Sequence, residues 1–504
     1  PIMPWDIFSV GTAASVAGNY DYSLDLETVA VLAAFVLLMA VESRFSLMAP
    51  RRLLKRGVLI FLPVLLLGGY VRLLQSDSFV ADFGLYDKLF TPTVMNRRDG
   101  NIVAFLMEMK YMNVEKPSGY SAKETGERYL ENTPEQTTAA LEHPDSINRP
   151  NIIVIMDEAF SDLAVLGDFS VNEDYMPFIH SLQQGADNTV TGYLNVSVLG
   201  GNTANTEFEF LTGHSMAFLP QGSVAYQQYV KKETPSLASC LKDLGYSTVA
   251  IHPYYADGWD RDRVYPLLGF DRFLSRDDFY GAEKLRSYIS DRADFAKIIE
   301  LYEEKEAGEP FFVFNVTMQN HSGYSETFAN FTPSVAVEGI ASDTLNMYLS
   351  LIKETDSAFE ELIAYFSQVE EDTMIVFFGD HQPTASVSNP ILRSNGKNPD
   401  ALSEEENLLR YKVPYVIWSN FEMDQQSGLE TSVNYLALDV LKNCGLPLPS
   451  YQSALEAVRE EYPVISALQI RDKEGKYLTL EECGQEINDY QSLEYYLLFD
   501  YEKQ

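Results

Sequence analysis

Cysteine is scarce in this sequence. Cys240, Cys444 and Cys483 are the three cysteines among 504 residues, and no two of them form a CxxC pair. An odd number of widely spaced cysteines indicates neither a disulfide framework nor a thiolate metal site. Stability must therefore come from an apolar core, which 46% hydrophobic residues can supply. The length suggests roughly two to four structural units.

Positive charge is scarce as well. Lysine and arginine number 37 against 73 aspartates and glutamates, which gives a formal net charge of -36. Such a chain repels nucleic acid and anionic lipid surfaces at long range. We therefore expect no nucleic-acid partner.

Long hydrophobic runs are confined to the first 75 residues. Two apolar stretches there are near or below the roughly 20 residues that span a bilayer, and we predict transmembrane helices over about 28–42 and 57–74. The segment between them is basic, whereas the segment before them carries only acidic charges. By the positive-inside rule the chain after residue 75 faces outward, in a multi-pass protein that we expect to be truncated at its N-terminus. The alternative is a pair of buried helices in a soluble protein.

The remaining sequence changes character twice. Residues 76–149 are mixed and polar, which predicts a helical stem. From 150 to 445, short apolar runs alternate with segments of helical period, which is typical of an α/β domain with a mostly parallel sheet between helices. Residues 446–504 are acidic and tyrosine-rich, and we expect a small element packed on that domain. The predicted strands are 152–156, 189–195 or 189–199, 248–252, 311–316, 374–378 and 414–418, and the predicted helices are 235–244, 291–305, 344–366 and 433–442.

Three strand-like runs end in residues that bind metals or act as nucleophiles. In an open α/β sheet the carboxyl ends of the strands line the ligand crevice, so residues far apart in the sequence meet there. We therefore expect one site. Residues 152–156 lead into Asp157 and Glu158, residues 196–199 lead through a Gly-Gly-Asn turn to Thr203, and residues 374–379 lead into Asp380 and His381.

These residues offer a suitable set of metal ligands. Glu158, Asp380 and His381 supply two carboxylates and one imidazole, which suit Mn²⁺, Mg²⁺ or Zn²⁺. Singly, each has an ordinary alternative, such as a helix cap or a surface charge, but their shared position favours a metal site. Thr203 is placed at the start of a helix, where free N–H groups attract an anion and a nearby cation would activate its hydroxyl. A plain N-cap is the alternative.

Two further segments follow predicted strands and contain groups that bind phosphate. The first runs from His252 through Trp259 to Arg261, and the second contains His321. Arginine clamps phosphate with two hydrogen bonds, and histidine can carry a proton. The ordinary alternatives are core packing for Trp259, a surface ion pair of Arg261 with a neighbouring aspartate, and a hydrogen-bonded loop position for His252.

Together these residues resemble the extracellular catalytic domain of lipoteichoic acid synthases, a branch of the sulfatase and alkaline phosphatase superfamily. The resemblance covers about residues 151–418, and the membrane helices and stem before it are laid out similarly. It implies one divalent cation, manganese in that family, and a pocket for a glycerol phosphate headgroup. The implied metal ligands are Glu158, Thr203, Asp380 and His381, and the implied headgroup residues are His252, Trp259, Arg261 and His321.

The sequence departs from the family pattern at one position. A serine is expected five residues after the metal aspartate, whereas this chain has Ala385, between Thr384 and Ser386. One contact to the headgroup is therefore not accounted for, and the exact substrate stays open. Members of the superfamily that hydrolyse sulfate esters need Cys or Ser in a C/S-x-P-x-R context, which Thr203 does not have, so sulfate ester hydrolysis is disfavoured.

The resemblance implies a two-step phosphoryl transfer. Thr203 would take glycerol phosphate from phosphatidylglycerol, and a glycolipid anchor or growing polyglycerolphosphate chain would accept it, with His321 or His252 carrying the proton. The expected setting is the outer face of the cell membrane of a Gram-positive-type bacterium. The alternatives are a phosphoethanolamine transferase or phosphodiesterase of the same superfamily, and a non-catalytic protein that binds glycerophosphate polymer.

Overall fold

The structure is a computed structural model in which the chain forms two compact units, residues 1–113 and 114–504. The residues described are 3–11, 26–42, 44, 53–85, 92–112, 114–131, 135–220 and 222–502.

The first unit contains two apolar helices and several short ones. Helix α2 has 17 residues, and helix α3 has 22 residues with Pro63 in its interior and Arg72 in its last turn. Among the residues described, no helix combines the length and the apolar character needed to cross a bilayer. The transmembrane helices predicted over 28–42 and 57–74 are therefore not supported. Helix α2, with 17 residues, is shorter than the roughly 20 residues that span a bilayer. The helices are α2 (Leu26–Glu42), α3 (Leu53–Leu74), α4 (Asp77–Asp82), α5 (Pro92–Asp99) and α6 (Asn101–Glu108).

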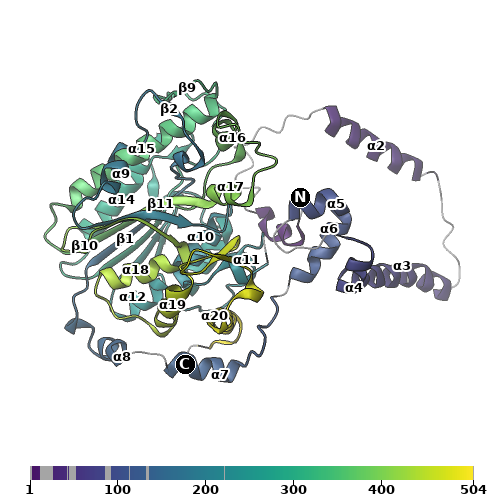
Figure 1. Cartoon of the computed structure of the whole chain (residues 1–504), viewed down its shortest axis with the longest axis horizontal. Helices are drawn as coiled ribbons and strands as arrows, with labels where there is room; N and C mark the ends of the chain where they lie inside the picture. Colours follow the sequence, from purple (N-terminus) through teal and green to yellow (C-terminus); the bar gives the residue numbers. More distant parts are fainter. Residues whose placement is uncertain are drawn as a thin grey trace. The chain divides into compact units, whose positions relative to one another are not determined.

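An eight-stranded sheet forms the centre of the second unit (Figure 1). Its strands lie in the order β12-β3-β11-β10-β1-β8-β4-β5. Neighbouring strands pair in parallel, except that β11 runs antiparallel to β10 and β3. Seven of the eight strands therefore point the same way, and the predicted α/β fold with a mostly parallel sheet is confirmed. The strands are β1 (Asn151–Asp157), β3 (Thr189–Asn195), β4 (Ser247–Ile251), β5 (Arg272–Leu274), β8 (Phe311–Val316), β10 (Thr373–Gly379), β11 (Lys412–Ser419) and β12 (Gln426–Ser432).

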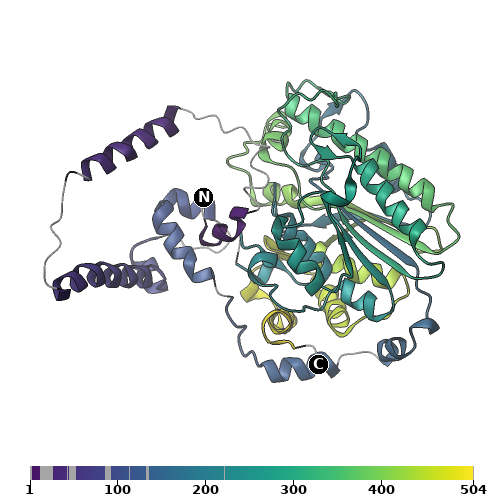
Figure 2. The ribbon, with the colours of Figure 1, turned by 180° about the vertical axis from the view of Figure 1, so that it is seen from behind.

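Helices cover both faces of this sheet, as the two opposite views show (Figure 1) (Figure 2). Strand β1 explains why, since all seven of its residues are buried and its side chains alternate between two apolar cores. Ile152 and Val154 pack in the core with α10, α12, α13 and α18, whereas Ile153 and Ile155 pack with α9, α14, α15 and α16. The helices are α9 (Pro177–Gln183), α10 (Thr203–Thr212), α11 (Ala225–Gln228), α12 (Leu237–Asp243), α13 (Arg261–Leu267), α14 (Asp291–Glu304), α15 (Asp343–Phe366), α16 (Ala385–Ser394), α17 (Glu404–Leu408) and α18 (Leu436–Asn443).

The six predicted strands are confirmed to within two residues and the four predicted helices to within three, since residues 433–435 form a 3-10 turn before α18. The longer version of the second strand is wrong, because β3 ends at Asn195 and residues 196–199 leave the sheet to reach the turn at Gly200. Strand β12 was not among the predicted strands. Its sequence QSGLETS is polar because the strand lies at the sheet edge, where β3 is its one partner among the strands described.

The last residues form a small element of helices and a three-stranded sheet on the second unit. Its apolar side chains, such as Leu455 and Ile487, share a core with Phe218 and Tyr435. The backbone N–H of Ser215 donates to a carboxylate oxygen of Glu494, which fixes the element to the loop after α10. The elements are α19 (Ser450–Glu461), β13 (Val464–Ser466), β14 (Gln469–Arg471), β15 (Tyr477–Leu478) and α20 (Gln485–Tyr495), with α7 (Ala122–Glu131) in contact and α8 (Glu135–Glu142) nearby in the sequence.

Gly379 ends β10 where the strand passes close to the loop that follows β1. A Cβ atom at this position would lie 1.9 Å from the carbonyl oxygen of Phe160. No side chain fits there, so the approach of these two segments requires glycine directly before Asp380.

We expect Gly379→Ala to destabilise the second unit by at least about 1–3 kcal/mol, the usual cost of forcing extra atoms into a packed core. Denaturant unfolding followed by circular dichroism measures this. Gly69→Ala is the control, because no atom lies within 4 Å of a Cβ built there. An unchanged midpoint for Gly379→Ala would contradict the close approach.

Candidate functional site

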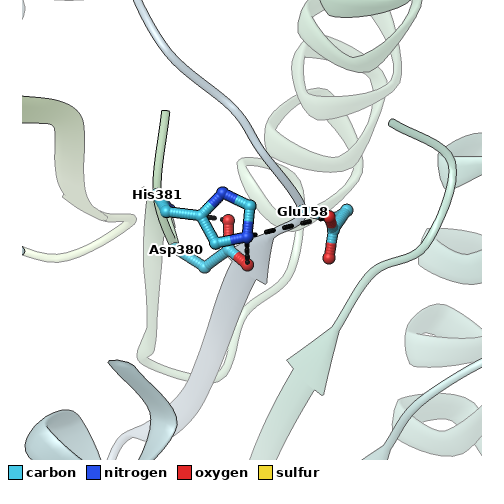
Figure 3. A group of neighbouring side chains, drawn as sticks. All are labelled: Glu158, Asp380 and His381. Atoms are coloured by element: carbon cyan, nitrogen blue, oxygen red, sulfur yellow. Dashed lines mark hydrogen bonds and ion pairs between the residues drawn. The ribbon is translucent and has the colours of Figure 1, made fainter. Parts of the chain in front are cut away.

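Two parallel strands bring the predicted metal ligands together. Glu158 follows β1 and Asp380 follows β10, and the register of these strands pairs Asp157 with Gly379. His381 Nε2 lies 3.2 Å from Asp380 Oδ2 and 3.9 Å from Glu158 Oε1 (Figure 3). One ligand atom from each of the three residues lies within 4.8 Å of the others, and all three residues are buried.

Hydrogen bonds fix which atoms of these side chains are available to a cation. The backbone N–H groups of Ala159 and His381 both donate to Asp380 Oδ1, at 2.7 Å each. Asp380 Oδ2 is left buried without a hydrogen-bond partner. His381 Nδ1 lies 3.0 Å from the carbonyl oxygen of Gln382, which can only accept, so Nδ1 carries the proton and the lone pair is on Nε2. His381 Nε2 is also buried without a hydrogen-bond partner, which is the usual arrangement of a metal-bound histidine.

The electrostatics of the cluster favour a bound cation. Burial raises the pKa of Glu158 well above its usual value, and the neighbouring carboxyl of Asp380 raises it further. Burial also raises the pKa of Asp380. Two carboxylates and one imidazole lone pair, converging in a buried space, fit a divalent ion such as Mn²⁺, Mg²⁺ or Zn²⁺, which would compensate their charge.

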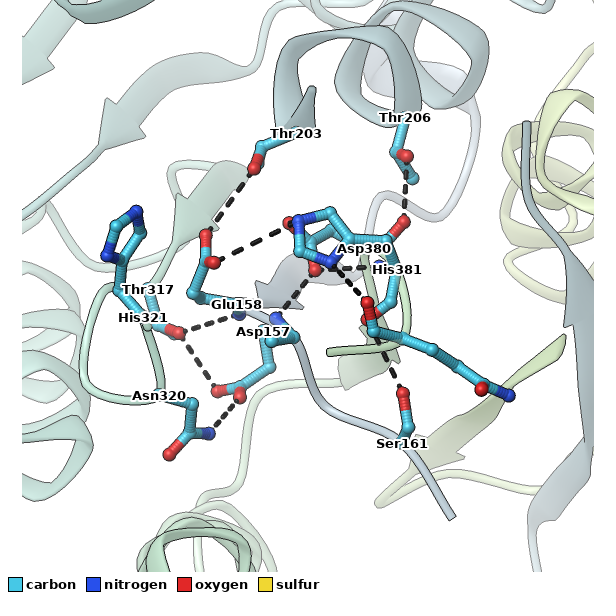
Figure 4. Close-up of polar contacts among 12 residues, drawn as sticks. Asp157, Glu158, Ser161, Thr203, Thr206, Thr317, Asn320, His321, Asp380 and His381 are labelled. Atoms are coloured by element: carbon cyan, nitrogen blue, oxygen red, sulfur yellow. Dashed lines mark hydrogen bonds and ion pairs between the residues drawn. The ribbon is translucent and has the colours of Figure 1, made fainter. Parts of the chain in front are cut away.

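Thr203 lies at the first position of α10, beside these ligands. Its Oγ1 donates to Glu158 Oε2 at 3.4 Å (Figure 4). The turn before it requires unusual backbone angles, with Gly200 at φ 68° and Asn202 at φ 65°. The N–H of Gly200 donates to the Gln382 carbonyl at 2.9 Å, which ties this turn to the loop that carries His381. Since α10 is fully buried, its N-terminus has a fixed position against the cluster.

A layer of buried polar groups beneath the cluster holds it in place, and the sequence reasoning missed it. Asp157 accepts hydrogen bonds from Thr317 Oγ1 at 3.0 Å and from Asn320 Nδ2 at 2.8 Å. Thr317 Oγ1 in turn accepts from the backbone N–H of Glu158 at 3.1 Å. Thr206 Oγ1, one turn after Thr203, donates to the carbonyl oxygen of Asp380 at 2.8 Å. Two of these residues could have been found from their positions in the sequence. Asp157 directly precedes the predicted ligand Glu158, and Asn320 directly precedes His321.

His252 and His321 follow the neighbouring strands β4 and β8. His252 Nδ1 lies 2.9 Å from the carbonyl oxygen of Val316, so it donates there and presents an unprotonated Nε2. Burial, and then the charge of Arg261, lower the pKa of His252 well below 6.5. Burial lowers the pKa of His321 to about 4, and the nearby His381 and Arg286 contribute. Both imidazoles are therefore neutral at neutral pH.

Arg261 is buried, and its ion pair is with Glu207 rather than with a neighbouring aspartate. Its Nε lies 3.0 Å from Glu207 Oε1, and its Nη2 donates to the same oxygen. The hydroxyl of Tyr265 donates to Glu207 Oε2 at 2.7 Å. Glu207, which the sequence reasoning missed, thus fixes the guanidinium from α10, the helix that begins with Thr203. The charge of Arg261 lies close enough to lower the pKa of Glu158.

The two remaining positions that the sequence singled out are Trp259, which packs against the apolar core, and Ala385. Trp259 is half-buried in a left-handed turn, at φ 58°, two residues before Arg261. Ala385 is exposed at the start of α16. The hydroxyls on either side of it, from Thr384 and Ser386, are 3.0 Å apart. A Cβ on Gly200 would lie 3.4 Å from Thr384 Cα, so this pair of hydroxyls is next to the turn that leads to Thr203.

The sheet brings its strand-end ligands beside the threonine at the start of α10, which forms a candidate metal-binding active site. The chain belongs to the sulfatase family, since residues 150–445, more than half of its length, match the family model described as Sulfatase.

Two curated proteins are similar to this chain in sequence. A protein of Rhizobium meliloti named for cyclic beta-1,2-glucan modification is 32% identical over 419 residues, which is 80% of this chain and 62% of the relative. Lipoteichoic acid synthase 1 of Bacillus subtilis is 25% identical over 286 residues, 55% of this chain and 43% of the relative. The chain thus spans less than two thirds of either relative. The predicted resemblance to lipoteichoic acid synthases is confirmed.

Solved structures share the fold. Phosphoglycerol transferase GacH of Streptococcus pyogenes, in complex with sn-glycerol-1-phosphate, has a TM-score of 0.58 at 22% identity, over 76% of this chain and 94% of that one. Lipoteichoic acid synthase LtaP of Listeria monocytogenes has a TM-score of 0.50 at 18% identity, over 74% and 97%.

We expect Mn²⁺ to raise the thermal unfolding midpoint of the protein, and a chelator to reverse the shift. A ligand whose free concentration is 100 times its Kd stabilises the folded protein by about 2.7 kcal/mol. Asp380→Asn, which keeps the shape of the side chain but removes its charge, should abolish most of this shift. Asp372→Asn is the matched control. Asp372 lies directly before β10, at the end of the strand away from the cluster, and its exposed carboxylate accepts a hydrogen bond from Asn148. Equal shifts in both variants would contradict the site.

Proposed function

We propose that this enzyme transfers glycerol phosphate from phosphatidylglycerol to a glycolipid anchor or a growing polyglycerolphosphate chain, through an intermediate bound covalently to Thr203. The observation that carries the proposal is the Thr203 hydroxyl, placed at a buried helix N-terminus 3.4 Å from Glu158 Oε2 in the ligand cluster. Relatives named as lipoteichoic acid synthases support a role in the synthesis of such a polymer.

In the first half-reaction Thr203 is the nucleophile. Glu158, Asp380 and His381, with the Thr203 oxygen, would hold a divalent cation, for which we propose Mn²⁺, and that ion favours the alkoxide form of the threonine. Thr203 Oγ forms a bond to phosphorus while the bond from phosphorus to the diacylglycerol oxygen breaks. The departing oxygen needs a proton, and we assign His321 as the residue that donates it. A glycerophosphoryl-threonine results.

In the second half-reaction the acceptor hydroxyl attacks the same phosphorus. Its proton passes to His321, and Thr203 leaves as the alkoxide with which the cycle began, so no proton is gained or lost overall. Arg261 would offset negative charge on the phosphoryl oxygens, from the position that Glu207 fixes. We assign His252 and Trp259 to the glycerol headgroup, since the unprotonated His252 Nε2 can accept a hydrogen bond from a glycerol hydroxyl.

The proposed lipids place the enzyme at the outer face of the cell membrane. The first unit has the surface for such an association, because α2 and α3 expose large apolar side chains, with Phe35 59% and Phe61 73% exposed. Burying such surface is favourable by about 25 cal/mol per Å².

A second acceptor follows from the relative in Rhizobium meliloti. Its name refers to modification of a cyclic beta-1,2-glucan, and its similarity covers 80% of this chain. A saccharide hydroxyl is thus a candidate acceptor for the same Thr203-bound group, with the donor unchanged.

We expect Thr203→Ala to abolish diacylglycerol release from phosphatidylglycerol and to keep the fold. Intact-protein mass spectrometry should show a glycerophosphoryl adduct on the wild type and none on the variant. Thr212→Ala at the other end of α10 is the control, because its hydroxyl bonds Phe208 within the helix. Undiminished release by Thr203→Ala would exclude Thr203 as nucleophile, and absent release from the wild type would favour a non-catalytic binding protein.

The donor is tested by competition. With equal amounts of phosphatidylglycerol and phosphatidylethanolamine in mixed micelles, we expect the adduct mass to be that of glycerophosphoryl in at least about nine of ten modified molecules, because only the glycerol headgroup offers two hydroxyls to polar side chains. A predominant phosphoethanolamine adduct would contradict the donor and identify a phosphoethanolamine transferase. Release of diacylglycerol without any transfer product would identify a phosphodiesterase.

A further inference from the structure

A short hairpin contacts the loop that carries His321. It consists of β6 (Lys284–Leu285) and β7 (Tyr288–Ile289), and its turn contains Arg286 in the left-handed region at φ 55°. A non-glycine residue in this region is strained, and such strain gathers at functional sites. The strand-end pattern of metal ligands does not include this hairpin.

Arg286 fixes the backbone of the His321 loop. Its Nη2 donates to the carbonyl oxygens of Gln319 and His321, at 2.7 Å each. Its guanidinium lies 5.5 Å from the ring centre of Tyr288 and 5.4 Å from that of Tyr324, at cation–π distance. Arg286 is 5% exposed, so these contacts are shielded from water.

Tyr288 fixes the imidazole itself. Its hydroxyl lies 3.0 Å from His321 Nδ1, with ring centres 5.5 Å apart. Because Nδ1 is engaged by the hairpin, Nε2 is the nitrogen that can act on a substrate. Figure 4 shows His321 at the same edge of the sheet as Thr203 and Glu158.

The partner of Nδ1 distinguishes His321 from the two other histidines of the site. His252 and His381 each meet a backbone carbonyl, which only accepts, so their neutral forms must have an unprotonated Nε2. A phenol can also donate. With Tyr288 as donor to Nδ1, the neutral imidazole of His321 carries its proton on Nε2. His321 is then the one histidine of these three that can donate a hydrogen to substrate while uncharged.

We propose that Tyr288 is a positioning residue that makes His321 the proton donor to the departing oxygen. This inference rests on the proposed function. As the bond from phosphorus to the departing oxygen breaks, its electron pair stays on that oxygen, which takes the proton from His321 Nε2. The hydroxyl proton of Tyr288 moves to Nδ1, and the phenolate that forms lies beside the Arg286 guanidinium. In the second half-reaction the acceptor hydroxyl returns a proton to Nε2, and Nδ1 returns one to Tyr288.

Two water-soluble glycerophosphodiesters test the proposal. One has a simple alcohol as leaving group, which needs a proton to depart, and the other has nitrophenol, which departs as the anion. We expect Tyr288→Phe to lower kcat for the alcohol diester by about 10²-fold or more, the usual contribution of a general acid, and kcat for the nitrophenyl diester by less than about threefold. His321→Gln should show the same selectivity, and the double variant should lose little more than either single variant.

Tyr324→Phe is the matched control. It removes a tyrosine hydroxyl from the same cluster, one that bonds the Asn320 carbonyl at 2.6 Å and not an imidazole. We expect it to slow both diesters by the same factor. Equal slowing of both diesters by Tyr288→Phe would reduce Tyr288 to a structural role and overturn the proposal, as would unchanged kcat for both. The donor assignment fails separately, on the wild type, if phosphatidylglycerol yields no diacylglycerol while the soluble diesters react.

Discussion

The parallel pairing of β1 with β10 is the constraint on which the rest of the site depends. Its register sets Asp157 opposite Gly379, so Glu158 and Asp380 leave the sheet side by side. Two backbone N–H groups then hold one oxygen of Asp380 and turn the other toward His381 Nε2. A shift by one residue would move these side chains to opposite faces of the sheet. The glycine at 379 leaves no room for such a shift.

The parts of the fold that could be predicted from the sequence are those with local signals. Buried parallel strands read as apolar runs, and Asp380 and His381 directly follow one of them. Contacts between distant segments gave no comparable signal. Glu207 is recognisable as the partner of Arg261 only once α10 lies against α13, although an acidic residue one turn after Thr203 in a buried helix is a clue. The hairpin with Arg286 and Tyr288 is short, and β12 is polar, so neither shows a period.

The three histidines at the strand ends have different Nδ1 partners, and we therefore expect them to have different chemical roles. Carbonyl partners leave His381 ready to bind a cation and His252 ready to accept a hydrogen bond. A phenol partner lets His321 donate. Burial keeps His252 and His321 neutral, so in this site the direction of each hydrogen bond, rather than the charge of the ring, sets what the imidazole does.

The central claim, that the strand ends of β1 and β10 hold a cation through one imidazole nitrogen, is tested most directly by pulsed electron paramagnetic resonance of the Mn²⁺-loaded protein. The wild type should show the nuclear modulation of a single directly bound histidine nitrogen. That signal should disappear in His381→Gln and persist in His252→Gln. A signal that survives in His381→Gln, or Mn²⁺ bound with no nitrogen coupling in the wild type, would contradict the arrangement described above.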